Sequence, residues 1–148
     1  MVIPPFNQDG LLPPGIYRGS LAEARGRFGA FQGSDQRPRL WARLVEYVRE
    51  AAMSGAVEMV LVDGSFVTAK PDPNDIDLVI VLPASHDFSA DLPAAQYDVL
   101  AQKRVRKRFG FDILVVKNGS DSLEHAVAFF QQVRQRPGVK KGLLEIIL

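Results

Sequence analysis

Apolar positions follow two patterns along the chain: helical spacing in some segments and short continuous runs in others. Between residues 38 and 55 they recur at three- and four-residue steps, with Pro38 suited to a first turn and Gly55 to a stop, which predicts a helix. Short continuous apolar runs predict β-strands. These expected strands are 57–62, 75–83, 111–116 and 142–148.

Three more segments have helical patterns. Ser20 with Glu23 forms a capping box, which predicts a short helix to about residue 28. Single helices are expected over 91–110 and 120–136. Residues 1–19, rich in proline and glycine, are expected to form an irregular arm. Helices alternate with strands, so we predict one domain, 1–148, of the α/β (α+β) class with a mixed β-sheet flanked by helices.

Composition narrows the class of protein. The chain is 47% hydrophobic and 24% charged, as in ordinary globular domains, and no apolar run approaches the roughly 20 residues that span a bilayer. The first residues show no secretory signal pattern. With no cysteine, disulfides and thiolate chemistry are excluded. We therefore expect a cytoplasmic protein without a membrane partner.

Two aspartates stand one residue apart at the start of the second apolar run. Residues two apart in a strand point to the same side, with Cα atoms about 6.5–7 Å apart, so Asp75 and Asp77 would project together. Two carboxylates at this spacing repel each other, and a hard divalent cation such as Mg²⁺ would offset that repulsion. The alternative is ordinary: a turn residue followed by an outward residue of a half-exposed strand.

A third acid and a glycine-serine turn add to this pair. Asp112 begins another apolar strand, and if the acidic strand ends are neighbours, three carboxylates converge as in metal-assisted phosphoryl transfer. Gly64 and Ser65 follow the strand at 57–62, where free amides and a hydroxyl could bind phosphate oxygens. Alone, a Gly-Ser pair is usually an ordinary turn.

Taken together, these motifs resemble the polymerase-beta-like nucleotidyltransferase superfamily over about residues 58–116. Nearly the whole chain is also similar to a small bacterial nucleotidyltransferase-like family. The shared features are Leu12–Gly15, Asp63–Thr68, Asn74–Asp77, Arg136–Gly138 and Lys141-Gly142.

The resemblance implies specific roles. Asp75 and Asp77 would hold two Mg²⁺ (or Mn²⁺) ions that bridge a nucleoside triphosphate, and Asp112 would ligate the second ion and help activate a hydroxyl. Gly64 and Ser65 would bind the β- and γ-phosphates. The reaction would transfer a nucleoside monophosphate to a protein or RNA hydroxyl, and family analogy suggests a toxin–antitoxin or phage-defence module.

Basic residues supply further candidates. Lys70 could reach a triphosphate from its loop, although such lysines are usually solvated. A cluster that includes Arg136 and Lys141 would also suit a triphosphate. The run KRVRKR at 103–108 has five basic residues in six and could hold a nucleic-acid backbone, or simply form a solvated helix end. The aromatic pair Phe129 and Phe130 is expected in the core rather than as a base-stacking platform.

Two features leave the function open. Phe66, Val67 and Thr68 follow Gly-Ser where minimal nucleotidyltransferases usually carry a small residue and an arginine. No second helical domain is predicted either. The acceptor could bring its own surface, a cognate partner protein could complete the site, or the domain could be a non-catalytic module that binds a nucleotide or a partner.

Overall fold

A computed structural model describes residues 3–148 and shows a single α/β domain built on a mixed sheet. The five strands within these residues are β1 (Gly15–Gly19), β2 (Met59–Asp63), β3 (Asp77–Leu82), β4 (Asp112–Lys117) and β5 (Gly142–Ile146). They lie in the order β1-β5-β2-β3-β4. The outer pairs β1–β5 and β3–β4 are parallel, and β2 runs antiparallel to both of its neighbours. The predicted fold class is confirmed.

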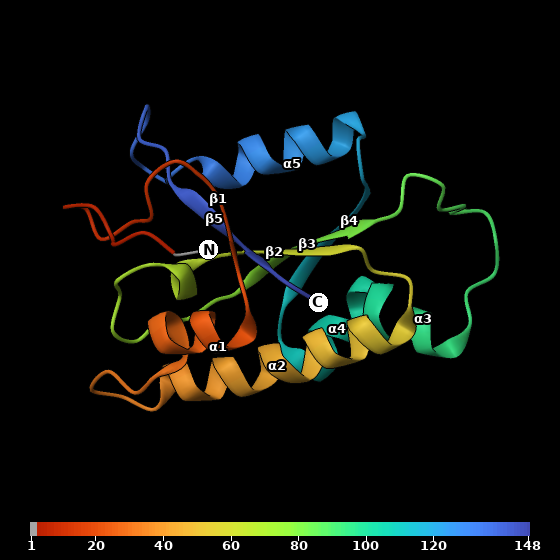
Figure 1. Ribbon diagram of the computed structural model, residues 1–148, viewed down its shortest axis with the longest axis horizontal. Coiled ribbons are helices and arrows are strands. Elements are labelled where there is room, and N and C mark those ends of the chain that lie inside the picture. Colours follow the sequence, from red (N-terminus) through yellow and green to blue (C-terminus); the bar gives the residue numbers. More distant parts are fainter. Residues whose placement is uncertain (1–2) are drawn as a thin grey trace.

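Helices cover both faces of the sheet unequally (Figure 1). They are α1 (Leu21–Ala24), α2 (Gln36–Ser54), α3 (Ala94–Leu100), α4 (Gln102–Phe109) and α5 (Asp121–Gln131). A π-helical turn η1 (Arg25–Gly29) continues α1, and a 3-10 turn η2 (Ser65–Val67) follows β2. Helices α1 to α4 lie on one face and α5 lies alone on the other.

Three predicted segments need correction. The arm 1–19 is not irregular throughout, because Gly15–Gly19 forms β1 beside β5. The single helix 91–110 is wrong: Ala101 is extended (ψ 113°) and separates α3 from α4. Val99 and Val105 are both fully buried, yet on one continuous helix they would lie about 120° apart around the axis. The break lets both face one core.

Helix α5, the third segment that needs correction, is shorter than predicted. Helix α5 begins as expected at its cap, where the Ser120 side chain accepts a hydrogen bond from the amide of Leu123. It ends at Gln131, not at residue 136. Residues 132–140 form a hairpin-like segment instead, with Gln132 bridged to Lys140 and Gly138 at φ 81° in its turn.

Two hydrophobic clusters hold the sheet between its helices. The large one packs α2 against alternate strand residues such as Leu78 and Ile80, with Leu44 fully buried at its centre. The small one lies under α5 and contains Leu61, Val79, Val81, Val116 and Ala126. No helix within residues 3–148 has the length and apolar character that a bilayer crossing requires.

The arm before β1 lies against two later segments. The amide of Ala69 donates to the carbonyl of Gly10 (2.9 Å), and Leu11 bridges Thr68. The amide of Gly142 donates to the carbonyl of Leu12 (2.9 Å). The arm thus connects the loop after η2 with the start of β5, and Leu11 forms part of the pocket described next.

Candidate functional site

Three aspartates form a row across neighbouring strands at one end of the sheet. Asp63 is paired with Asp77 between β2 and β3, and Asp77 is paired with Asp112 between β3 and β4. Directly paired residues point to the same face of a sheet. Val79 and Val81, which share that face with Asp77, pack in the cluster under α5. The row therefore belongs to the α5 face.

Asp75 is placed differently from the sequence prediction. It lies in the loop before β3, which begins at Asp77, so the two aspartates do not project from one strand. The amide and the hydroxyl of Ser65 both donate to Oδ1 of Asp75, the amide at 3.0 Å. The amide of Asn74 in turn donates to Oγ of Ser65 at 3.0 Å. The Gly-Ser turn and the acidic loop are therefore one hydrogen-bonded unit.

Gly64 is required in this unit for two reasons. Its φ of 94° lies in the region that side chains rarely adopt. A Cβ at this position would also lie 2.7 Å from the carbonyl oxygen of Asp75 and 3.2 Å from the amide nitrogen of Asp77. Glycine here lets the two loops approach each other, and so sets the separation between Ser65 and the acids.

The carboxylates of the site have opposite pKa shifts. Burial, reinforced by the charges of Asp75, Asp63 and Asp112, raises the pKa of Asp77 to about 6. Burial also opposes ionisation of Asp75, but hydrogen bonds from Ser65 and the charges of Lys141 and Lys70 outweigh it and lower the pKa of Asp75. Negative charge is therefore concentrated around Asp77, which is where a cation would relieve most repulsion.

A pocket of about 860 Å³ opens in front of these residues. Gly64, Ser65, Asp75 and Asp77 line one side of it. The segment 132–141 lines the other side and supplies four cations. They are Arg134, Arg136, Lys140 and Lys141. The structure thus brings six of the eight predicted site residues, including Arg136 and Lys141, into one cavity with acidic and basic walls.

The other two predicted residues lie outside this pocket. Asp112 is exposed, and its Oδ1 accepts a hydrogen bond from Nε of Arg106 (2.7 Å) and lies 2.5 Å from Nη2 in the same ion pair. Lys70 is exposed and does not line the pocket, although its charge contributes to the low pKa of Asp75. Asp112 remains the strand neighbour of Asp77, so its distance from the pocket is a matter of its side-chain orientation.

Asp63 is a site residue that the sequence interpretation missed. It is only 5% exposed, lines the pocket, and its Oδ1 lies 2.9 Å from Nζ of Lys141. Burial raises the pKa of Asp63 against the opposing effect of Lys141. This ion pair ties the basic segment to the acidic row. The available signal was its position: like Asp77 and Asp112, Asp63 stands at the end of an apolar strand.

Arg37 is a second residue that was missed, because its fully buried side chain lies in the first turn of a helix where arginine is ordinarily solvated. Its guanidinium donates to four carbonyl oxygens. These belong to Phe28 (3.1 Å), Phe66 (2.7 Å), Thr68 (2.6 Å) and Lys70 (2.6 Å). Arg37 therefore holds the loop between the Gly-Ser turn and Asp75 in place through the backbone carbonyls of that loop.

The donor set of the pocket meets part of what a metal site needs. Residues 3–148 contain no group of three or more acidic, histidine or cysteine side chains arranged to hold an ion. Asp75 and Asp77 nevertheless share the pocket, beside Asp63, and carboxylate oxygens are the ligands that Mg²⁺ prefers. Their chemistry fits a divalent cation, while Asp112 would have to turn away from Arg106 to join them.

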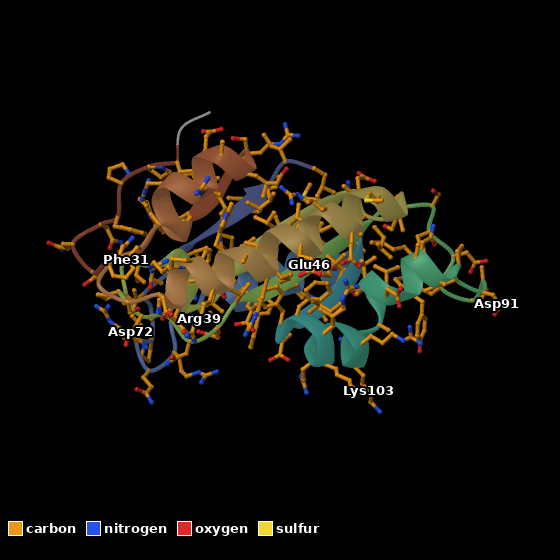
Figure 2. The ribbon with its side chains drawn as sticks, turned by 90° about the horizontal axis from the view of Figure 1, so that it is seen from below. Phe31, Arg39, Glu46, Asp72, Asp91 and Lys103 are labelled. Atoms are coloured by element: carbon orange, nitrogen blue, oxygen red, sulfur yellow. The ribbon has the colours of Figure 1, made fainter. Side chains whose placement is uncertain are left out.

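The basic run of α4 does not form a free cationic surface. Arg104 pairs with Asp98, Arg106 with Asp112, and Arg108 with both Glu46 and Glu50. Figure 2 shows α4 beside α2, with Lys103 pointing outward. Three of the five cations are thus matched by carboxylates, which weakens the case for a nucleic-acid surface here.

Comparisons with known proteins place the chain in a family. No curated protein and no solved structure matches it. A family model, described as a family of unknown function, DUF6932, matches residues 4–147. This match includes the acidic row, the Gly-Ser turn and the basic segment. The chain belongs to the DUF6932 family.

Proposed function

We propose that the protein is a Mg²⁺-dependent nucleotidyltransferase that moves a nucleoside monophosphate from a nucleoside triphosphate to a protein or RNA hydroxyl. One observation carries this proposal. A single pocket has the Gly64-Ser65 turn and two carboxylates, Asp75 and Asp77, on one side and four cationic side chains on the other. Such a cavity matches a triphosphate, which is anionic and needs both cationic donors and a carboxylate-bound metal.

Each wall has a distinct task in this proposal. Arg136 and Lys141 bind phosphate oxygens and hold the triphosphate chain in the pocket. Gly64 and Ser65 line the same pocket, so the turn would contact the phosphate chain there. Asp75 and Asp77 would hold Mg²⁺, which supplies charge neutralisation on the phosphates when it is bound. Loop 66–70, fixed by Arg37, keeps Asp75 at the correct distance from the turn.

The polymerase-beta-like resemblance supports the same proposal through the spacing of the motif. The Gly64-Ser65 turn lies close to Asp75 and Asp77, as that resemblance requires. Ser65 is also hydrogen-bonded to the acidic loop, through Asp75 and Asn74. The third carboxylate would be Asp112, whose backbone pairs with that of Asp77. In this proposal, Asp112 would have to leave Arg106 in order to help hold the cation.

The test is a transfer assay. The purified protein is incubated with each α-labelled nucleoside triphosphate, Mg²⁺ or Mn²⁺, and cell extract as the source of acceptors. We expect label on a protein or RNA and its loss in Asp77→Asn, which has nearly the same shape but no charge. Asp91→Asn, an exposed position away from the pocket, is the matched control and should keep the activity. Transfer that survives Asp77→Asn would refute the proposal.

A second candidate function is a non-catalytic module that binds a nucleotide or a partner. The observation in its favour is that Asp112 is bonded to Arg106 and Asp75 to Ser65, so two of the three acids already have partners. Calorimetry for nucleotide binding, run beside the transfer assay, separates the candidates. A binding module takes up nucleotide without transferring label to any acceptor, whereas the enzyme does both.

A further inference from the structure

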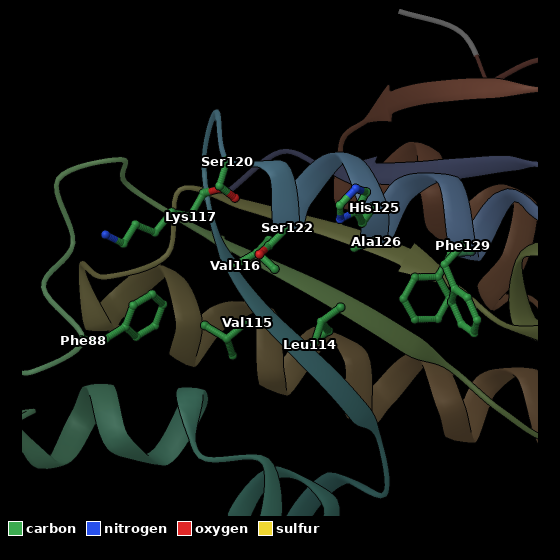
Figure 3. A pocket seen from close by; sticks show the side chains of 11 residues that line it. Phe88, Leu114, Val115, Val116, Lys117, Ser120, Ser122, His125, Ala126 and Phe129 are labelled. Carbon is green, nitrogen blue, oxygen red and sulfur yellow. The ribbon is translucent and has the colours of Figure 1, made fainter.

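A second pocket, of about 720 Å³, lies between α5 and the edge strand β4 (Figure 3). Its walls are mainly apolar, with Leu114 on the strand and Ala126 and Phe129 on the helix. Pockets of this size are typical of small-molecule sites. Phe88 and Lys117 border it toward the end of β4, away from the acidic row.

This apolar pocket adjoins the acidic and basic pocket described above. Phe129 and Phe130 line both cavities. Leu114 follows Asp112 by two residues on β4, so it points to the same face of the sheet one step further from the acidic row. A ligand with a charged end and an apolar end could therefore occupy both pockets at once, with Phe129 at the junction.

Phe129 is an unusual residue for this junction. The expectation that it belongs to the core is wrong, because it is 66% exposed, whereas Phe130 is half-buried against the small cluster. The two rings meet edge to face, with centroids 5.2 Å apart. Phe130 thus holds the ring of Phe129 in place and leaves a large aromatic surface free at the pocket, which is suited to stacking.

Polar groups on α5 lie along the same groove. Ser122, His125 and Phe129 are spaced three and four residues apart and therefore share one face of the helix. All three line the apolar pocket. The hydroxyl and the imidazole offer hydrogen-bond donors and acceptors to the edge of a ring, while the aromatic and apolar groups contact its faces.

We propose that this groove binds the nucleobase of the nucleotide whose phosphates occupy the adjoining pocket, with Phe129 and Leu114 on either side of the base. This inference rests on the proposed function and adds a base site to it. A planar heterocycle joined to a triphosphate has one stacking end and one anionic end, which are the two chemistries that meet at Phe129. The three residue steps from Leu114 to Lys117 span about 10 Å, enough for a base with its sugar.

The experiment measures binding of two probes by titration calorimetry in Mg²⁺. One probe is each of the four nucleoside triphosphates, and the other is inorganic tripolyphosphate, which has the anionic chain but no base. Phe129→Ala should weaken the best nucleoside triphosphate by about tenfold, as expected for loss of one stacking ring, and should leave tripolyphosphate unchanged. Leu114→Asp should act in the same direction.

Phe31→Ala is the control, since Phe31 has nearly the same exposure, 67%, but lies in the loop before α2 (Figure 2). It should bind both probes as the wild type does. Nucleotide affinity that is unchanged in Phe129→Ala and Leu114→Asp, or tripolyphosphate affinity that falls equally, overturns the base site and leaves the proposed function standing. A wild type that binds neither probe overturns the proposed function and this inference together.

Discussion

The two faces of the sheet differ in what their side chains are used for. The face under α1 to α4 is closed by a large cluster, and its central residues, such as Leu44 and Ile80, are fully buried. The α5 face has one helix, a small cluster, two pockets and the acidic row. One sequence thus places stabilising contacts on one side and repelling or exposed groups on the other.

This division explains how the domain tolerates an acidic row. Like charges near Asp77 cost free energy in the folded state, and the exposed ring of Phe129 gains little from burial. The large cluster offsets that cost from the opposite face, so the α5 face is free to keep groups suited to a ligand. The two faces should therefore respond to substitution with different magnitudes and even opposite signs.

The largest difference is expected for a matched pair of leucines. Leu44→Ala should lower the free energy of unfolding by about 3–4 kcal/mol, because it leaves a cavity in the closed cluster. Leu114→Ala, at a side chain that is 38% exposed in the apolar groove, should cost less than about 1 kcal/mol. Urea denaturation measures both. Equal losses would show that the α5 face is also part of the stabilising core.

A smaller loss of stability is expected on substitution of Arg37, which connects the sheet face under α1 to α4 with the site. Arg37→Met removes four hydrogen bonds and should cost about 2–3 kcal/mol; the carbonyls of Thr68 and Lys70, which are only part-buried, can regain water. Arg39→Met, two residues later with an exposed guanidinium (Figure 2), is the matched control and should change stability little. An Arg37→Met protein as stable as the Arg39→Met protein would contradict the role given to Arg37.

The sequence predicted the sheet face under α1 to α4 better than it predicted the candidate site. Apolar periodicity correctly placed α2 and the buried strands, because burial and period are expressed within each segment. It missed the break at Ala101, β1 and the exposure of Phe129, since these depend on which partners tertiary packing supplies. Gly64, Ser65 and Asp77 were predicted from the combined motifs and their resemblance, and they line one pocket.

Residues that join distant segments were the ones left out. The pairing of Asp63 with Lys141 spans about half of the chain, and Arg37 contacts carbonyls about 30 residues away, as the hydrogen bond to Phe66 shows. Neither contact leaves a local pattern. The condition set for Asp112, that its strand neighbours that of Asp77, is met, but its bond with Arg106 could not be read from the sequence.

Substitution of Asp77 should change the free energy of unfolding in the opposite direction to substitution of Leu44 or Arg37. Its pKa is raised to about 6 from the ordinary 3.8, so the folded state binds the proton more tightly, and stability falls as pH rises from about 4 through 6. Asp77→Asn removes that penalty and should raise the free energy of unfolding by about 1 kcal/mol at pH 8, after allowance for solvent screening of this half-buried group. At pH 4 the gain should largely vanish.

Thermal unfolding in EDTA at both pH values measures this effect, and the exposed Asp91→Asn is its control. A destabilised Asp77→Asn at pH 8 would show that the carboxylate contributes to folding rather than to a ligand site. Added Mg²⁺ should stabilise the wild type and not Asp77→Asn, because a cation that binds only the folded site raises its stability by mass action.

The smallest change in stability is expected for the ion pair between Arg106 and Asp112. Both side chains are exposed, at 72% and 62%, so Arg106→Gln should change the free energy of unfolding by less than about 1 kcal/mol. Its effect on the α5 face should be larger than its effect on folding. Without Arg106, the carboxylate of Asp112 is free to turn toward Asp77, its partner on the neighbouring strand. Mg²⁺ should therefore bind the Arg106→Gln protein several-fold more tightly than the wild type, and the gain should disappear in Arg106→Gln/Asp112→Asn. If both variants bind Mg²⁺ as the wild type does, Asp112 belongs with the exposed ion pairs of α4 and not with the acids of the site.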